Sequence, residues 1–156
     1  INGWRTALGR REDRLDPWTS KHLGHLADLE ANAPDASRGE TLLHFDTRAD
    51  NILIAMGRVY VVDWPSARLG APWVDWVAMA PSVAMQGGPA PEDLLRRFEL
   101  KHVPDAAIDA VLCSLAGYFT VRALEPPPPG IPTVRAFQAA QGKVAVAWLR
   151  RRLGWP

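Results

Sequence analysis

The sequence has one cysteine, almost no net charge and no long apolar run. A single thiol, Cys113, cannot form an internal disulfide, so the chain is not a disulfide-stabilised secreted domain. It indicates a buried thiol in a reducing compartment, and we expect a cytoplasmic protein. The 18 basic and 17 acidic residues give a net charge of +1, which argues against binding to nucleic acid or to an anionic membrane.

The most apolar stretch, residues 110–121, is shorter than the ~18 residues that a membrane span needs, and it predicts a core helix. The chain opens Ile1-Asn2-Gly3 rather than with Met, so a processed or truncated polypeptide is expected. What the sequence does contain, 47% hydrophobic and 22% charged residues, is typical of one globular domain with an ordinary core.

One stretch, residues 41–64, carries a pattern with chemical meaning. Asp46 is followed five residues later by Asn51, and Asp63 comes at the end of the next β-rich segment. Catalytic loops of phosphoryl transfer use this pattern. In such loops the first Asp orients or deprotonates the accepting hydroxyl, and the Asn and the later Asp hold Mg²⁺ against the nucleotide phosphates.

The segments 52–54 and 59–62 are rich in β-branched residues and flank Met56-Gly57-Arg58, which predicts a hairpin. The hairpin would bring Asp63 beside Asn51. Two oxygen ligands, completed by water and phosphate oxygens, are what Mg²⁺ prefers. The sequence therefore predicts that Asn51 and Asp63 bind the metal and, through it, the nucleotide.

These residues resemble the catalytic lobe of the aminoglycoside phosphotransferase family, which includes choline-kinase-like enzymes and is distantly related to the protein kinases. The family loop reads His-Gly-Asp, four residues and Asn, then Ile-Asp-Trp or Val-Asp-Trp; His44, Asp46, Asn51 and Asp63-Trp64 match, and Phe45 replaces the Gly. The resemblance implies transfer of a γ-phosphate from ATP, or possibly GTP, to a hydroxyl of a small molecule. The acceptor cannot be identified from the sequence.

The resemblance also implies roles for residues around Asp46. Arg48 stands where protein kinases carry a lysine that neutralises the γ-phosphate, and a surface arginine is the equal alternative. His44 is expected to hydrogen-bond backbone near the loop, and Asp50 to be a turn residue that bonds backbone. Asp75 matches a family Asp that braces the catalytic loop.

The resemblance implies an α+β fold, a mainly helical protein-kinase-like C-lobe over residues 16–156 with one catalytic loop and hairpin. Residues 1–15, which are rich in arginine, predict a solvated linker or hinge remnant, with phosphate steering as the alternative. No glycine-rich loop is present and Lys21 lies in a helical pattern, so nothing resembles the family's N-lobe. We expect that missing N-lobe elsewhere in the same protein.

Capping residues and apolar spacing predict the helices. The first helix covers about 17–31 and is followed by a loop at 32–40. The second includes Trp73 and ends before a loop at 86–91, and three further helices start near 91, 104 and 133. His22 and His25 have a spacing that could bind metal, but ordinary surface or core histidines are the simpler interpretation. Some aromatic and methionine residues could line a substrate cleft, although such residues more often form core: Trp73, Trp76, Met79 and Met85.

Two other function classes fit the same sequence. The chain could be a non-catalytic binding or regulatory module that keeps the kinase fold, or a plain helical interaction domain in which the loop pattern is accidental. An Asp63→Ala variant separates the first alternative from an enzyme, because only an enzyme would lose metal-dependent turnover.

Overall fold

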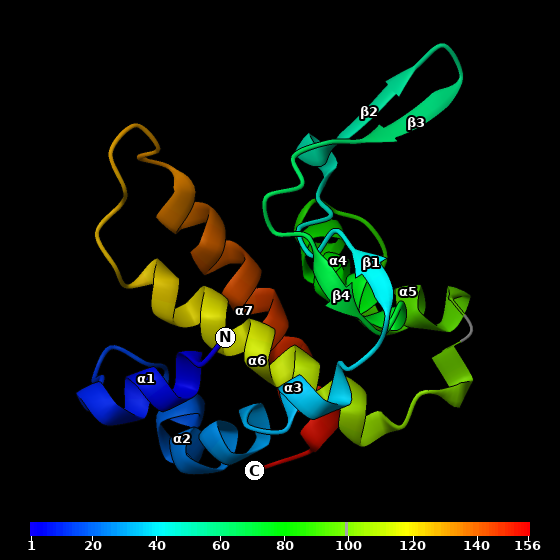
Figure 1. Cartoon of the computed structure of the whole chain (residues 1–156). Coiled ribbons are helices and arrows are strands. Elements are labelled where there is room, and N and C mark those ends of the chain that lie inside the picture. The colour runs from blue at the N-terminus through cyan, green and yellow to red at the C-terminus, as the bar shows by residue number, and fades with distance from the viewer. Residues whose placement is uncertain (99) are drawn as a thin grey trace. The chain divides into compact units, whose positions relative to one another are not determined.

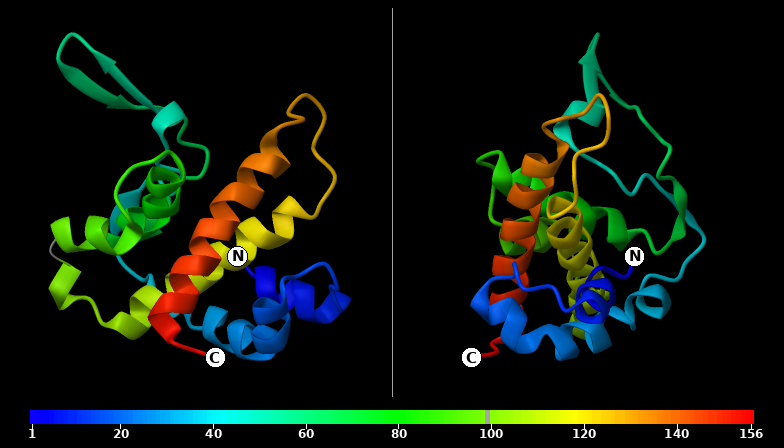
Figure 2. Two further views of the ribbon diagram at one scale, coloured as in Figure 1. Left: turned by 180° about the vertical axis from the view of Figure 1, so that it is seen from behind. Right: turned by 90° about the vertical axis from the view of Figure 1, so that its left-hand side faces the viewer.

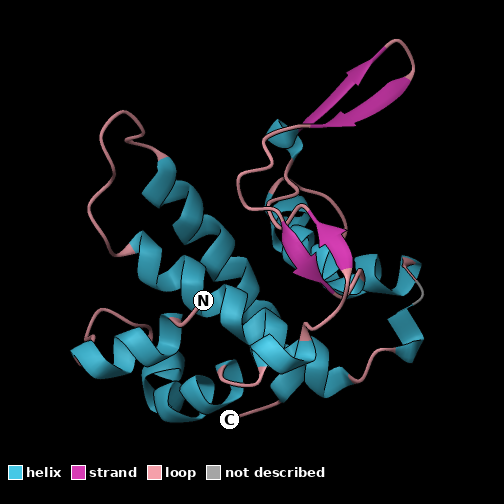
Figure 3. Ribbon diagram, in the orientation of Figure 1, coloured by secondary structure: helices cyan, strands magenta, loops and turns pink. Residues whose placement is uncertain are grey.

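The computed structural model describes residues 1–98 and 100–156, and of Lys101 it describes only the backbone. The chain forms two compact units, one of residues 1–36 with 105–156, and the other of residues 37–104 (Figures 1 and 3). The first is helical, with α1 (Gly3–Arg10), α2 (Pro17–Glu30), α3 (Ala33–Ala36), α6 (Asp105–Ala123) and α7 (Val134–Leu153). The second holds β1 (Thr41–Leu43), η1 (Ala49–Asn51), β2 (Ile52–Ala55), β3 (Arg58–Val61), β4 (Arg68–Gly70), α4 (Trp73–Met85), α5 (Pro91–Arg97) and η2 (Leu100–His102).

The mainly helical α+β class is confirmed, whereas the kinase-like lobe stays a prediction. In the helical unit, α6 packs against α1, α2, α3 and α7. Apolar side chains of these helices form the core, and several are wholly buried: Trp4, Leu26, Leu112, Trp148 and Leu149. Gly3 and Gly117 let α1 and α6 touch, because a Cβ at Gly3 would lie 2.1 Å from the carbonyl carbon of Gly117.

Residues 1–15 are not the solvated linker that their arginines indicated, because residues 3–10 form helix α1. The Trp4 side chain is 0% exposed, and its Nε1–H donates to the carbonyl oxygen of Cys113 at 2.8 Å. The buried carboxylate of Glu30 accepts the backbone N–H groups of Trp4 (3.3 Å) and Arg5 (3.1 Å) and so caps the start of α1. Trp4 and Ala7, three residues apart, form the buried apolar face of α1. The sequence did not indicate this face, because the segment is rich in arginine.

Helix α2 begins as the sequence predicted. Asp16 is its N-cap, with the carboxylate accepting the N–H groups of Trp18 and Thr19 at 3.1 Å each, and Pro17 is the first helical residue. The loop expected over 32–40 contains the short helix α3. Among the described residues no group of three potential metal-ligating side chains exists, and His22 instead contacts the Pro156 carbonyl oxygen at 2.9 Å, so the metal alternative for His22 and His25 is not supported.

Helix α6 has 19 residues; it begins at Asp105, as the helix expected to start near residue 104, and contains the apolar stretch 110–121. By length and a mean hydropathy of 1.3 it would suit a membrane span. However, 56% of that window is buried inside the protein, as in the core helix of a water-soluble fold.

The second unit contains two antiparallel pairs, β1 with β4 and β2 with β3. The β2–β3 hairpin turns through Met56 and Gly57, both with positive φ, which is the geometry of a type I′ turn. In Figures 1 and 2 this hairpin projects away from β1 and β4, and most of its apolar side chains are exposed, including Ile54 at 78%.

Of the four residues proposed for a cleft or core, Trp73 is buried, and Trp76 stacks on Phe98 with ring centroids 3.9 Å apart.

Candidate functional site

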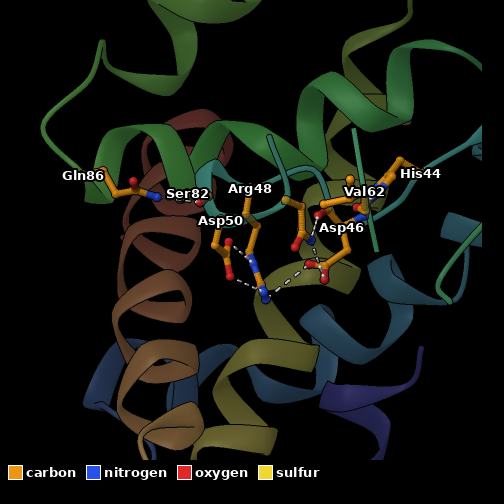
Figure 4. A network of polar contacts seen from close by, with 8 residues as sticks. His44, Asp46, Arg48, Asp50, Val62, Ser82 and Gln86 are labelled. Atoms are coloured by element: carbon orange, nitrogen blue, oxygen red, sulfur yellow. Dashed lines mark hydrogen bonds and ion pairs between the residues drawn. The ribbon is translucent and has the colours of Figure 1, made fainter. Parts of the chain in front are cut away.

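The polar loop of residues 44–51 follows directly from β1 and ends in the short helix η1 (Figure 4). Leu43 anchors the end of β1, since it is 2% exposed and pairs with Arg68 of β4. The loop is thus held at its start by a strand pair and at its end by the hairpin.

Asp75, in the first turn of α4, fixes the beginning of this loop. Its two carboxylate oxygens accept the backbone N–H groups of His44 and Phe45, each at 2.8 Å. Hydrogen bonds to an ionised acceptor are roughly twice as strong as neutral ones. This geometry is what the expected brace requires.

The His44 ring links the loop to the end of β3. Its Nε2 lies 2.8 Å from the carbonyl oxygen of Val62, and its Nδ1 accepts the backbone N–H of Asp46 at 3.3 Å. Together these contacts join the ring to backbone atoms at both the loop and the end of the hairpin. The side chain is buried, and Trp64 packs edge-on against it with centroids 4.7 Å apart. His44 therefore lies in the structural position that was expected, bonded to backbone near the loop.

Phe45 adopts a left-handed backbone conformation with a φ of 62°. A bulky residue is rare there and costs about 1 kcal/mol, whereas glycine adopts this conformation readily. The conformation gives a physical reason for the Gly that the family motif carries at this position. The Phe45 ring lies under the Arg68 guanidinium, whose carbon is 4.0 Å from the ring centroid, and such a cation–π contact offsets part of the cost.

Asp46 and Asn51 meet across the loop. The Asn51 side-chain N–H₂ donates to the backbone carbonyl of Asp46 at 2.8 Å and reaches its carboxylate Oδ2 at 3.4 Å. Asn51 is only 4% exposed, and its backbone N–H also bonds to the Arg48 carbonyl oxygen at 3.0 Å. Burial raises the pKa of the Asp46 carboxyl, with the Asp50 charge adding to it, although Arg48, His44 and Asn51 act in the opposite direction.

Arg48 is held between two carboxylates. It donates to Asp50 through Nε (3.0 Å) and Nη2 (2.8 Å), and its Nη1 lies 3.4 Å from Asp46 Oδ1. Burial alone would lower the pKa of Arg48, but the hydrogen bond to Asp50 and the neighbouring negative charges hold it above its ordinary value. The guanidinium lies beside the Asp46 carboxylate. Phosphate binding by Arg48 stays a prediction, and a surface arginine stays the equal alternative.

Asp63 follows the hairpin as expected. The register pairs Ile52 with Val61, and the Val62 N–H donates to the Asn51 carbonyl at 2.9 Å. This pairing puts the residue before Asp63 directly against Asn51. Asp63 itself has a left-handed φ of 64°, and its charge contributes to the raised pKa of Arg48.

The oxygens of Asn51 and Asp63 are of the type that Mg²⁺ takes. Among the described residues no cluster of three His, Cys, Asp or Glu side chains occurs, so any other ligands of such a metal would be water and phosphate oxygens. Among the described residues the Asn51 side-chain oxygen accepts no hydrogen bond, since both of that side chain's bonds to Asp46 are made by its nitrogen. The donor set therefore fits the metal that the sequence implied.

Sequence reasoning missed two residues of this network. Asp50 was expected to bond backbone, and its carboxylate also holds Arg48 in bidentate fashion, which the sequence did not indicate. Arg68 was not considered, because its contact with Phe45 depends on the β1–β4 pairing of residues 25 apart. The only local signal was the spacing of Arg48 and Asp50.

Gln86, at the end of α4, donates to the Ser82 hydroxyl at 3.2 Å and completes the polar contacts in Figure 4.

Comparison with known proteins gives one finding. A sequence profile of the phosphotransferase enzyme family (APH) matches residues 2–110. No curated protein and no solved structure matches the chain significantly. The match contains the whole 44–51 loop, the hairpin and Asp75, and it begins well before Asp16, where the resemblance was expected to start.

Proposed function

This chain belongs to the phosphotransferase enzyme family, and from that premise we propose that it transfers the γ-phosphate of ATP to a hydroxyl of a small molecule. The observation that carries the proposal is the convergence of Asp46, Arg48 and Asn51 in one loop, with Asp63 at the end of the adjoining hairpin. Phosphoryl transfer depends on positioning and charge stabilisation, and this loop supplies both kinds of group.

In this proposal Asp46 accepts the hydrogen bond of the attacking hydroxyl. Its carboxylate has the burial that raises its pKa, which makes it a better proton acceptor than an exposed aspartate. The hydrogen bond from Asn51 to the Asp46 carbonyl, and those from His44 and Phe45 to Asp75, restrict where this carboxylate can lie. The chain thereby prepares the orientation of the acceptor before it binds.

Asn51 and Asp63 would hold Mg²⁺, which when bound neutralises charge on the nucleotide phosphates. These two residues lie on either side of the hairpin's base, where the Val62–Asn51 hydrogen bond keeps the connecting backbone together. The left-handed backbone at Asp63 is a conformation that aspartate tolerates better than most residues.

Arg48 would bind phosphate oxygens. In the described structure its guanidinium is bonded to Asp50 and Asp46, so an incoming phosphate competes with two carboxylates. Asp50 keeps the bidentate pair and so holds the guanidinium near Asp46 while the weaker 3.4 Å contact is exchanged for phosphate. A cytoplasmic location, where ATP and reduced thiols are present, is part of the same proposal.

The test uses the complete natural polypeptide that contains these 156 residues, assayed for ADP release with ATP, Mg²⁺ and a panel of hydroxyl-bearing small molecules. An Asp46→Asn variant should bind ATP normally and lose ~10²–10⁴-fold in kcat. Asp13→Asn, at an exposed acid outside the loop, is the matched control and should keep full activity. ATP binding without acceptor-dependent turnover in the wild-type protein would instead support a non-catalytic kinase-fold module.

A further inference from the structure

The helical unit contains a groove whose lining includes no residue of the 44–51 loop or of the hairpin. It has a volume of about 710 Å³ and lies between α6, α7 and the start of α2. Apolar side chains form much of its lining, among them Trp18, Leu124, Val146 and Ala147. Both the volume and the apolar lining fall in the range of sites that bind small molecules.

Cations line one wall of this groove. Lys143, Arg150 and Arg151 all come from α7 and are exposed. None of the ion pairs found among the described residues includes any of these three. The groove has one acid, Asp16, whose carboxylate already accepts hydrogen bonds from the first turn of α2. Among the lining residues three cations therefore stand against one carboxylate, so the wall carries a net positive charge.

The apolar and cationic groups are already arranged. Lys143, Ala147 and Arg150 recur at intervals of four and three, so they lie on one face of α7. The Trp18 indole N–H donates to the Trp155 carbonyl oxygen at 3.1 Å, which fixes the ring. The guanidinium carbon of Arg150 lies 5.8 Å from the centre of that ring, so one cation sits directly over the apolar surface.

We propose that this groove binds a soluble small molecule with an apolar body and one carboxylate, the body lying against Trp18 and Val146 and the carboxylate pairing with Lys143 and Arg150. The charge complementarity distinguishes this ligand class from polycationic compounds, which the same wall would repel. The site lies wholly in the helical unit, and the inference does not depend on the proposed phosphotransfer.

The experiment is a calorimetric titration of the full polypeptide with decanoate, compared with decanol and decylammonium as probes of the same chain length. Decanoate should bind at least ~10-fold more tightly than either. The double variant Lys143→Gln/Arg150→Gln should weaken decanoate binding ~10-fold or more, because charged hydrogen bonds carry the discrimination. Arg5→Gln, an exposed cation of α1 outside the groove, should change nothing.

Two further variants keep the result independent of any loss of folding. Ala147→Trp fills the groove from an exposed position and should abolish decanoate binding with an unchanged circular dichroism spectrum. Lys143→Glu/Arg150→Glu should reverse the preference, so that decylammonium binds better than decanoate. The proposal is overturned if decanoate does not bind, if decanol binds equally well, or if the double Gln variant binds decanoate as the wild type does.

Discussion

The carboxylate of Asp75 accepts the backbone N–H of His44 at 2.8 Å, across 31 residues of sequence. The same carboxylate accepts the next N–H along, that of Phe45, so both of its oxygens are used. A helix-borne acid thereby determines where the loop begins and, two residues later, where Asp46 lies. The placement of the predicted catalytic carboxylate thus depends on a residue outside its own loop.

Asp75→Asn should lower kcat by about tenfold or more while leaving the Kd for ATP nearly unchanged. An amide presents one oxygen and one N–H₂, so one backbone N–H loses its acceptor and faces a donor instead, at a cost of ~1–3 kcal/mol. Steady-state kinetics and an ATP titration measure the two effects. Asp28→Asn, an exposed acid of α2, is the control. An unchanged kcat would show that the brace is not needed for catalysis.

Arg48→Met should move the acidic limb of the kcat/KM profile to higher pH. Asp46 must be ionised to accept the hydroxyl proton, so activity falls as pH falls through its pKa, which burial already raises. Arg48 lowers that pKa, and its loss also frees the Asp50 charge, which raises it further. The loss of the Arg48 charge and the freed Asp50 charge therefore both raise the pKa of Asp46. An acidic limb that stays in place or moves to lower pH would contradict the assignment of Asp46 as the proton acceptor. The control variant Arg5→Met should leave the acidic limb where it is in the wild type.

Phe45→Gly should be more stable than Phe45→Ala by about 1 kcal/mol. Both variants lose the ring under Arg68, but only glycine adopts the left-handed backbone at φ 62° without strain. Denaturant unfolding of the two variants side by side measures the difference. If Phe45→Ala were equally stable, the left-handed backbone at this position would not be the source of strain.

Trp4→Ala should destabilise the helical unit by about 3–5 kcal/mol, since it removes a wholly buried side chain and its hydrogen bond to Cys113. Leu8→Ala, at a half-exposed position of the same helix, should cost much less. Thermal unfolding followed by circular dichroism gives both values. A small loss for Trp4→Ala would restore the linker interpretation of residues 1–15.

The parts of the structure that sequence reasoning found are those encoded locally. The Asp16-Pro17 start of α2 depends on neighbouring residues, as does the hairpin turn at Met56-Gly57. The loop pattern could be recognised because Asp46 and Asn51 bond to each other across only five residues. The family match supports that recognition.

What was missed depends on contacts between distant residues. Trp4 is buried because Glu30 and Cys113 meet it from α2 and α6, and nothing in an arginine-rich segment shows those partners. The Arg68 contact with Phe45 likewise depends on strand pairing. Asp50 could have been found, since an acid two residues from an arginine forms a local pair, but it was read as a turn residue.

The central claim is that Asp46 serves phosphate transfer to a hydroxyl, and ³¹P NMR of the reaction mixture tests it most directly. With the complete polypeptide, ATP, Mg²⁺ and an accepted substrate, we expect a phosphomonoester resonance to grow as the γ-phosphate resonance of ATP decays. Asp46→Asn should nearly abolish it. A phosphomonoester formed equally fast by Asp46→Asn, or none formed from any acceptor by a wild-type protein that binds MgATP, would contradict the account.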